Sequence, residues 1–331
     1  MSNVTVEGNS VDHQGNCAGG GVYLSGGSAI VDHCAFRTNW IYRLNNRIPY
    51  GGAIYANGVN PLQVLNCDFS GNYISTKTYA AYGGALYAAG NGSMIVSNCV
   101  FTDNYLTNHP SYGKDRQGGT LYLSGAGLVG SIRHCALAGA GDNGNSTETL
   151  FVGGGAVSAV GVVIKGGLTG DGVCVSNIGS GSFGMTNCLI FAHPSNGVHV
   201  AAGAVRLANC TLTGNGGWGV SNEAGIVETI NCIAWTNGAG GFTPNCALTY
   251  TCSQEAHDGA GNKVADPLFA GVATNNFHLT RGSPCVNAGL NGSWTKADAD
   301  LDGKPRVSGG VVDMGPYELQ MPSGGTILMI H

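Results

Sequence analysis

The sequence is poor in charge and lacks the long apolar runs of membrane proteins. Of its 331 residues only 10% are charged, with 14 basic and 19 acidic side chains and a formal net charge of −5. A negative net charge argues against nucleic acid as a partner. No run of 18 apolar residues is present, so the sequence predicts no membrane span. Helical periodicity is also missing, but a hydrophobic fraction of 43% excludes a disordered chain.

Several catalytic and metal-binding motifs are missing as well. The twelve cysteines form no C-x-x-C pair, which gives zinc or thioredoxin-like chemistry little support. A nucleophile elbow, a phosphate-binding loop and an HExxH motif are all lacking. Glycine is abundant, at 57 residues, but without the G-X-Y period of collagen. Acidic residues are sparse in the first 250 residues and form no recurrent pair, which counts against a glycoside hydrolase.

What is present is an internal repeat. A glycine pair, a short apolar run, a polar residue before a cysteine and an F-x-x-N string recur in that order, as in "GGAIYANGVNPLQVLNCDFSGN" from Gly51 to Asn72. Seven cysteines occupy this repeated position after an Asn or a His, and we expect them to be small buried residues, one per repeat. They are Cys34, Cys67, Cys99, Cys135, Cys188, Cys210 and Cys232.

The repeat unit predicts the fold. Its basic length is about 22 residues, with inserts in the first half, and it holds short runs of alternating polarity separated by Gly and Asn. We predict an all-β, right-handed, single-stranded parallel β-helix over residues 1–250, with the Asn side chains forming hydrogen-bonded ladders at the corners. The glycine pair would supply either a positive φ or a corner too tight for a side chain.

The repeats resemble those of a known family. "GGAIY" with "FSGN" and "GGALY" with "FTDN" are similar to the repeats of polymorphic outer-membrane-protein-type adhesins over residues 19–130. The second half is closer to the broader pectate-lyase-like β-helix superfamily. The resemblance implies a bacterial surface protein involved in adhesion.

The C-terminal segment, residues 251–331, contains motifs that differ from those of the repeats. "DPLF", "GSPCVNAG", "DLDGKPR" and "VDMGPYE" resemble the closing module of secreted bacterial β-helix proteins of the choice-of-anchor type. We expect this module to cap the open end of the β-helix and limit end-to-end self-association. The resemblance implies an extracellular or cell-surface location, and we expect any export signal to lie upstream of Met1.

Two smaller features belong to this segment. Cys252 and Cys285 lie outside the repeated cysteine positions and would form a disulfide in an exported protein, with Cys246 as an alternative partner. Asp298, Asp300 and Asp302 before Gly303 match the start of a calcium loop, so Ca²⁺ is a candidate cofactor. Position twelve of that loop is Gly309 where an EF-hand has Glu, and the alternative is a polar turn.

Three inserts carry the candidate binding residues. They span residues 40–50, 73–82 and 105–117, and equivalent corners of a β-helix stack, so we expect all three to lie side by side. Their aromatic and basic side chains suit sugar rings that carry carboxylates or sulfates. The predicted ligand-binding residues are Trp40, Tyr42, Arg43, Arg47, Tyr79, Tyr105, Tyr112, Lys114 and Arg116.

These features favour one function and leave two alternatives. The leading prediction is non-catalytic adhesion to, or binding of, polysaccharides or host and matrix glycans through the inserts. The first alternative is a polysaccharide lyase or another carbohydrate-active enzyme using the same face. The second is a structural protein whose coils associate end to end into fibres. No catalytic residue is assigned, because no motif in the sequence identifies one.

Overall fold

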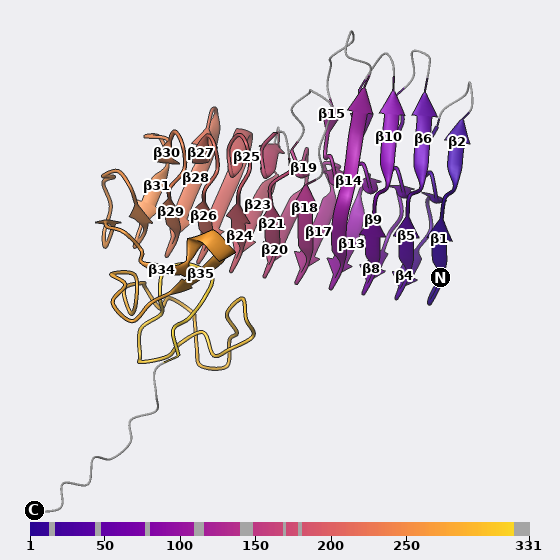
Figure 1. The fold of residues 1–331 in the computed structure, drawn as a ribbon. Coiled ribbons are helices and arrows are strands. Elements are labelled where there is room, and N and C mark those ends of the chain that lie inside the picture. Colours follow the sequence, from indigo (N-terminus) through magenta and orange to yellow (C-terminus); the bar gives the residue numbers. More distant parts are fainter. Residues whose placement is uncertain are drawn as a thin grey trace, which may run out of the picture.

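The computed structural model describes residues 1–12, 17–43, 48–76, 80–108, 116–139, 148–167, 170–177 and 181–320. Over these ranges the chain winds into a right-handed parallel β-helix whose coils stack along one axis (Figure 1). The predicted fold class is therefore confirmed. The described residues contain one short 3-10 helix, Val272–Thr274, and no helix long and apolar enough to cross a membrane.

Each coil adds one parallel strand to each of three faces. Face I consists of β3 (Val22–Ser25), β7 (Ile54–Asn57), β12 (Leu86–Ala89), β16 (Leu121–Ser124), β19 (Leu150–Val152), β22 (Val173–Ser176), the start of β25 (Val198–Ala208), β27 (Trp218–Asn222) and β30 (Gly240–Phe242). Face II consists of β4 (Ala29–Asp32), β8 (Leu62–Leu65), β13 (Gly92–Ser97), β17 (Leu128–Arg133), β20 (Ala156–Val160), β23 (Ser182–Thr186), the end of β25, β28 (Gly225–Ile230) and β31 (Ala247–Thr249). Face III consists of β1 (Thr5–Glu7), β5 (Ala35–Arg37), β9 (Asp68–Ser70), the start of β14 (Val100–Asn108), β18 (Ala136–Gly139), β21 (Val163–Lys165), β24 (Leu189–Phe191), β26 (Thr211–Thr213), β29 (Ile233–Trp235), β32 (Cys252–Ser253) and β33 (Lys263–Val264).

The first coils are taller than the later ones because face III continues into a fourth layer (Figure 1). This layer is built from β2 (Ser10–Asp12), β6 (Trp40–Arg43), β10 (Tyr73–Thr76) and the end of β14. A two-stranded sheet of β11 (Ala81–Tyr82) and β15 (Arg116–Gln117) lies opposite it. Ile41, Ile74 and Leu106 fill a small separate core between the two.

The main core consists of columns of like residues, one residue per coil. Phe69 stacks between Phe36 and Phe101, with ring centroids 4.8 and 4.6 Å apart. All seven repeated cysteines are buried, as predicted, with at most 3% of their surface exposed. The Cys67 thiol donates a hydrogen bond to the Leu65 carbonyl at 3.0 Å. Stacking identical side chains in this way buries each repeat against the next.

The residue before each cysteine turns the corner between faces II and III. Asn66 and Asn98 have φ of 51° and 54°, and His33 and His134 have φ of 50° and 49° at equivalent positions. Asn is the non-glycine residue that most readily adopts this left-handed conformation, which explains the recurrent Asn-Cys pair. Gly161, with φ of 63°, takes the equivalent place in the coil where Val162 replaces the cysteine. We call all these positions the corner column: His33, Asn66, Asn98, His134, Gly161, Asn187, Asn209 and Asn231.

The asparagine that ends each F-x-x-N string forms the predicted ladder. Asn39, Asn72 and Asn104 are almost completely buried. The Asn72 amide donates to Oδ1 of Asn104 at 2.9 Å and to the Phe36 carbonyl at 2.8 Å, and its own Oδ1 accepts from Asn39. Each amide therefore ties three successive coils together, which satisfies the backbone groups at an otherwise dry corner.

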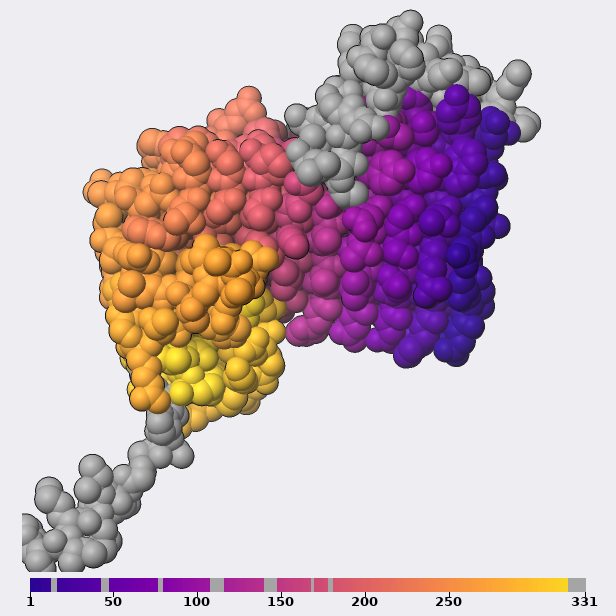
Figure 2. All heavy atoms as spheres, in the orientation of Figure 1, coloured from indigo at the N-terminus to yellow at the C-terminus, as the bar shows by residue number. Residues whose placement is uncertain are grey.

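The C-terminal segment differs from the predicted end cap. Among the described residues, 254–262 lie over the last coil: Glu255 accepts hydrogen bonds from the backbone N–H groups of Gly241 and Phe242, and His257 lies edge-on to the Phe242 ring. Residues 265–320, here called the lateral module, pack against the side of the later coils on face III (Figures 1 and 2). The module contains the antiparallel pair β34 (Phe269–Gly271) and β35 (Asn276–Leu279).

Candidate functional site

The predicted aromatic residues are strand residues of the fourth layer. Trp40, Tyr73 and Tyr105 occupy the same register on β6, β10 and β14. Their rings stack in a row, with centroids 5.8 Å apart for Trp40 and Tyr73 and 5.0 Å for Tyr73 and Tyr105. Tyr42 stands edge-on to Trp40 at 6.3 Å. Because alternate residues of these strands face the small core, this outer row faces away from it.

The basic residues of the prediction are placed only in part. Arg43 ends β6, and its side chain lies outside the described part of the molecule, as do Arg47, Tyr79, Tyr112 and Lys114. Arg116 is 5% exposed, and its guanidinium donates to the Leu106 carbonyl at 3.3 Å. Arg116 therefore helps to hold the fourth layer and does not present its charge on the surface.

A second aromatic row lies on face I, and it was not singled out in the sequence. It is formed by the aromatic residue of each G-G-x-x-Y string: Tyr23, Tyr55, Tyr87 and Tyr122, followed by Phe151. Neighbouring centroids are 4.9 to 5.3 Å apart. Tyr50 and Tyr82 pack beside this row and not beside Trp40, so the inserts do not gather their aromatics into one wall. The recurrence of the G-G-x-x-Y string is the sequence feature from which this row could have been predicted.

Stacking decides what each row can offer a ligand. Within a row the ring faces are occupied by one another, so the inner rings present their edges and hydroxyl groups outward. Burial raises the pKa of Tyr87 and of Tyr122, which keeps both phenols neutral donors. Each row has a first ring at the N-terminal end of the β-helix. In the fourth layer this is Trp40, whose neighbour on β2 is Ser10. On face I it is Tyr23, which lies on the first strand of that face. Among the described residues, no ring stacks on the outer face of either side chain, so each can offer one ring face to a ligand.

An acid–histidine cluster follows the face I row along the helix axis. His199, in register with Cys174, has Nδ1 3.5 Å from Asp171 and Nε2 3.3 Å from Glu223. Its hydrogen bond to Asp171 is the main cause that raises the pKa of His199. Burial would raise the pKa of Asp171, but hydrogen bonds to His199 and to the Asn196 backbone lower it overall. Such perturbed groups mark candidate sites for proton transfer.

Glu148 belongs to the same cluster. Its carboxyl group is buried, with 8% of the residue exposed, and it accepts a hydrogen bond from the Gly118 backbone at 2.7 Å. Burial raises the pKa of Glu148 to about 7. The cluster combines residues at least 23 positions apart that fall outside the repeated motifs, so the sequence offered only the presence of His199 and scattered acids.

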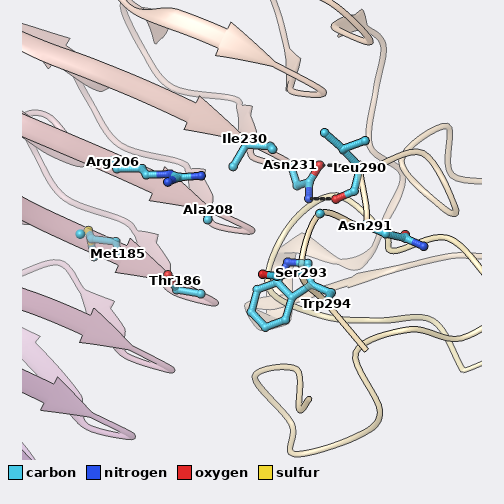
Figure 3. A pocket seen from close by; sticks show the side chains of 12 residues that line it. Met185, Thr186, Arg206, Ala208, Ile230, Asn231, Leu290, Asn291, Ser293 and Trp294 are labelled. Atoms are coloured by element: carbon cyan, nitrogen blue, oxygen red, sulfur yellow. Dashed lines mark hydrogen bonds between the residues drawn. The ribbon is translucent and has the colours of Figure 1, made fainter. Parts of the chain in front are cut away.

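A cleft of about 360 Å³ lies between face II and the lateral module (Figure 3). Thr186, Arg206 and Ile230 form its floor, and the Leu290–Trp294 loop forms its wall. Trp294 is fixed by a hydrogen bond from its Nε1 to Asn209 at 2.9 Å, with the Arg306 guanidinium 5.9 Å from its ring. A cleft of this size holds small molecules, and Arg206 gives it a cation.

The aspartates of the predicted calcium loop have protein partners. Asp300 is buried and accepts backbone hydrogen bonds from Asp302, Lys304 and Glu318. Asp298 accepts from Thr295, and Asp302 pairs with Lys304 at 2.7 Å. Among the described residues, no group of three or more His, Cys, Asp or Glu side chains could hold a metal ion. This arrangement favours the polar-turn alternative, and calcium binding stays a prediction.

The two cysteines of the predicted disulfide are neighbours. Cys252 on β32 and Cys285 in the lateral module are fully buried in one cluster with Ile233, Leu279 and Met314. Both thiols are free, and the Cys252 thiol donates a hydrogen bond to the Ala265 carbonyl at 3.1 Å. Cys246 lies in the main core and not in this cluster. The predicted proximity is present, and the covalent bond stays a prediction.

Fold and sites define a parallel β-helix with a laterally docked C-terminal module. No protein-family model and no curated protein matches the sequence. Among solved structures, the chain is similar to "Crystal structure of pectate lyase Pel9A", with a TM-score of 0.44 and 14% sequence identity over 87% of this chain and 88% of that chain. The fold assignment rests on the strand pairing of the present chain.

Proposed function

We propose that this chain is a non-catalytic, glycan-binding β-helix that acts outside the cell or at its surface, with an acidic polysaccharide lying across the Trp40–Tyr73–Tyr105 row. The observation that carries this proposal is the row itself: three large side chains in register on a rigid sheet, with the ring face of Trp40 unstacked beside Ser10. Rigid, preorganised aromatic surfaces bind with little loss of side-chain entropy.

The contacts differ from those expected from the sequence. Sugar C–H groups would stack on the free face of Trp40, while the edges of Tyr73 and Tyr105 would offer hydroxyl groups as hydrogen-bond partners. Arg37 is exposed on the same outer surface, one corner before Trp40, and can pair with a carboxylate or sulfate of the glycan. The described residues thus support binding through one aromatic platform, two phenol edges and a cation.

Binding is tested by retention on immobilised polygalacturonate and on neutral dextran. Trp40→Ala should weaken retention on polygalacturonate by about tenfold, which corresponds to about 1.4 kcal/mol. Tyr23→Ala is the matched control, because Tyr23 also ends an aromatic row and is 59% exposed. Full retention of Trp40→Ala, with an unchanged melting curve, would contradict the proposal.

A carbohydrate-active enzyme is the second candidate, and the acid–histidine cluster favours it. His199, held between Asp171 and Glu223, is the described group best placed to exchange a proton with a bound sugar. The same incubations report on it, because cleavage creates new reducing or unsaturated chain ends. If these ends appear with the wild type and vanish with His199→Gln, the chain is an enzyme and the non-catalytic proposal is wrong.

A further inference from the structure

The corner column already binds polypeptide backbone in the second half of the molecule. The Asn231 side chain donates to the Leu290 carbonyl at 2.9 Å and accepts from the Leu290 N–H at 2.8 Å (Figure 3). Asn209 donates to the Asp313 carbonyl, and Asn187 donates to the Ala299 carbonyl. Three successive corner amides are thus the hydrogen-bonding edge onto which the lateral module docks.

The surface of face III beside these amides is apolar, and the lateral module buries it. Leu189 and Ile233, the outward residues that begin β24 and β29, are 3% and 1% exposed. The equivalent residue of β14, Val100, is 45% exposed, and Ala136 on β18 is exposed too. The same surface therefore continues past the module, uncovered, over the earlier coils (Figure 2).

This uncovered surface is hollowed. Two adjoining hollows of about 560 and 470 Å³ share Asn98 and Val100, and the second ends against Leu301 and Tyr317 of the module. We call them together the corner groove. It is lined by the corner-column residues His33, Asn66, Asn98, His134 and Gly161, together with strand residues of face III. The groove is thus continuous with the interface that the module occupies.

Apart from His33 and His134, the charged side chains that line the groove are acidic. Asp68 and Asp302 line it, and Asp32 borders it by accepting a hydrogen bond from Asn66 at 2.9 Å. Lys and Arg are missing from the described residues that line either hollow. Asp302 is paired with Lys304 inside the module, and Asp32 is paired with His33 at 2.8 Å, whereas Asp68 lies on the open coils. A ligand for these coils would therefore carry positive charge.

We propose that the corner groove docks an extended segment of another protein that carries Lys or Arg. The amides of Asn66 and Asn98 would bind its backbone as Asn209 and Asn231 bind the module, and Val100 would contact its apolar side chains. Backbone hydrogen bonds would supply most of the contacts, and the basic residues facing Asp32 and Asp68 would set the preference for a cationic segment.

The probe is a labelled peptide that copies residues 286–294, the module segment containing Leu290, followed by two lysines. Fluorescence anisotropy should show binding to the whole chain, weakened about tenfold by the double change Asn66→Ala with Asn98→Ala. Val100→Lys, at an exposed position that can take a charge without unfolding, should also weaken binding, because the added cation repels the lysines of the peptide. Asn57→Ala on face I is the matched control and should leave binding unchanged.

Three outcomes would overturn the proposal. The first is no binding at about 1 mM peptide, the weakest specific affinity of interest. The second is binding that the corner variants leave unchanged while their melting curves match the wild type. The third is wild-type self-association in sedimentation velocity that Asn66→Ala with Asn98→Ala abolishes, because the occupant would then be a second copy of this chain.

Discussion

At the scale of single residues, Glu148 is a carboxyl group that the fold removes from water. Its pKa is about 7 in the folded chain and near the ordinary glutamate value of 4.5 when unfolded. Between these two values the folded state holds a proton that the unfolded state has lost. The free energy of unfolding must therefore fall as the pH rises from about 4.5 to 7, by an amount on the order of 3 kcal/mol.

Glu148→Gln should remove this dependence. The amide keeps an acceptor for the Gly118 N–H but does not ionise, so the variant should gain stability relative to the wild type as the pH rises from 5 to 8. Urea unfolding at both pH values measures the gain. Burial also raises the pKa of Glu318 to about 7. Because Glu318 is present in both proteins, its contribution to the pH dependence is the same in each and drops out of the comparison.

Glu228→Gln, at an exposed position on face II, controls for the loss of one negative charge. A stability difference between Glu148→Gln and the wild type that is the same at pH 5 and pH 8 would show that Glu148 ionises normally in the folded chain. The carboxyl group would then be reached by water.

Sequence patterns predicted the residues that repeat and missed those that do not. The burial of Cys67 and the ladder of Asn72 follow from their recurrence at one place in each unit, because coil stacking turns recurrence into contact. Glu148 and His199 occur once each and lie two coils apart, with Asp171 on the coil between them. Only the three-dimensional path of the chain could reveal that cluster.

At the scale of structural elements, the glycine pair serves two different purposes. Gly51, the first of its pair, has φ of +66°. Gly52, the second, has no left-handed φ, but a Cβ built on it would lie 2.0 Å from the carbonyl oxygen of Gly84 in the next coil. Both explanations offered by the sequence are therefore correct, one for each glycine, and the second follows from the tight stacking of successive coils.

Gly52→Ala should destabilise the chain by about 3 kcal/mol, because the clash is with backbone and neither coil can move without its neighbours. Gly58→Ala is the matched control: φ is +65° there and nothing lies within 4 Å of the added Cβ, so only about 1 kcal/mol of strain is expected. Urea midpoints for the two variants compare the effects. Equal losses would mean that the coils can separate at the glycine corner.

The inserts form a paired sheet that the sequence pattern did not predict. We predicted loops over residues 40–50, 73–82 and 105–117, yet β6, β10 and β14 continue into them as strands paired residue by residue. Aromatic and β-branched residues such as Trp40 and Ile41 favour strands, and stacking on the next coil supplies the pairing partner. The sequence identified the position of the inserts but not their sheet.

At the scale of the whole molecule, the C-terminal segment determines which surfaces remain open. A short stretch, residues 254–262, closes the last coil, and the lateral module covers the later coils of face III. Motifs in the sequence predicted a separate segment from residue 251, and strands β32 and β33 within it still add to face III. The side on which it docks depends on the corner amides Asn187, Asn209 and Asn231, whose role as docking points repeats alone could not reveal.

The contact between the module and the last coils includes the pair Cys252 and Cys285, which should form a disulfide when the chain refolds from urea with oxidised glutathione. The bond would close a loop of about 33 residues and raise the free energy of unfolding by roughly 3–4 kcal/mol. Peptide mapping identifies the linked pair, and unfolding with and without reductant measures the gain.

The matched comparison is Cys188 with Cys210, two free cysteines buried at equivalent positions of successive coils. Because these two belong to one column of parallel side chains on adjacent coils about 4.8 Å apart, their geometry is poor for a disulfide, and they should stay reduced in the same sample. A map that links Cys188 to Cys210, or leaves Cys285 free, would contradict the prediction. A free Cys285 would mean that docking of the module does not bring the sulfurs of Cys252 and Cys285 into bonding geometry. Hydrogen bonds and apolar contacts alone would then hold the module.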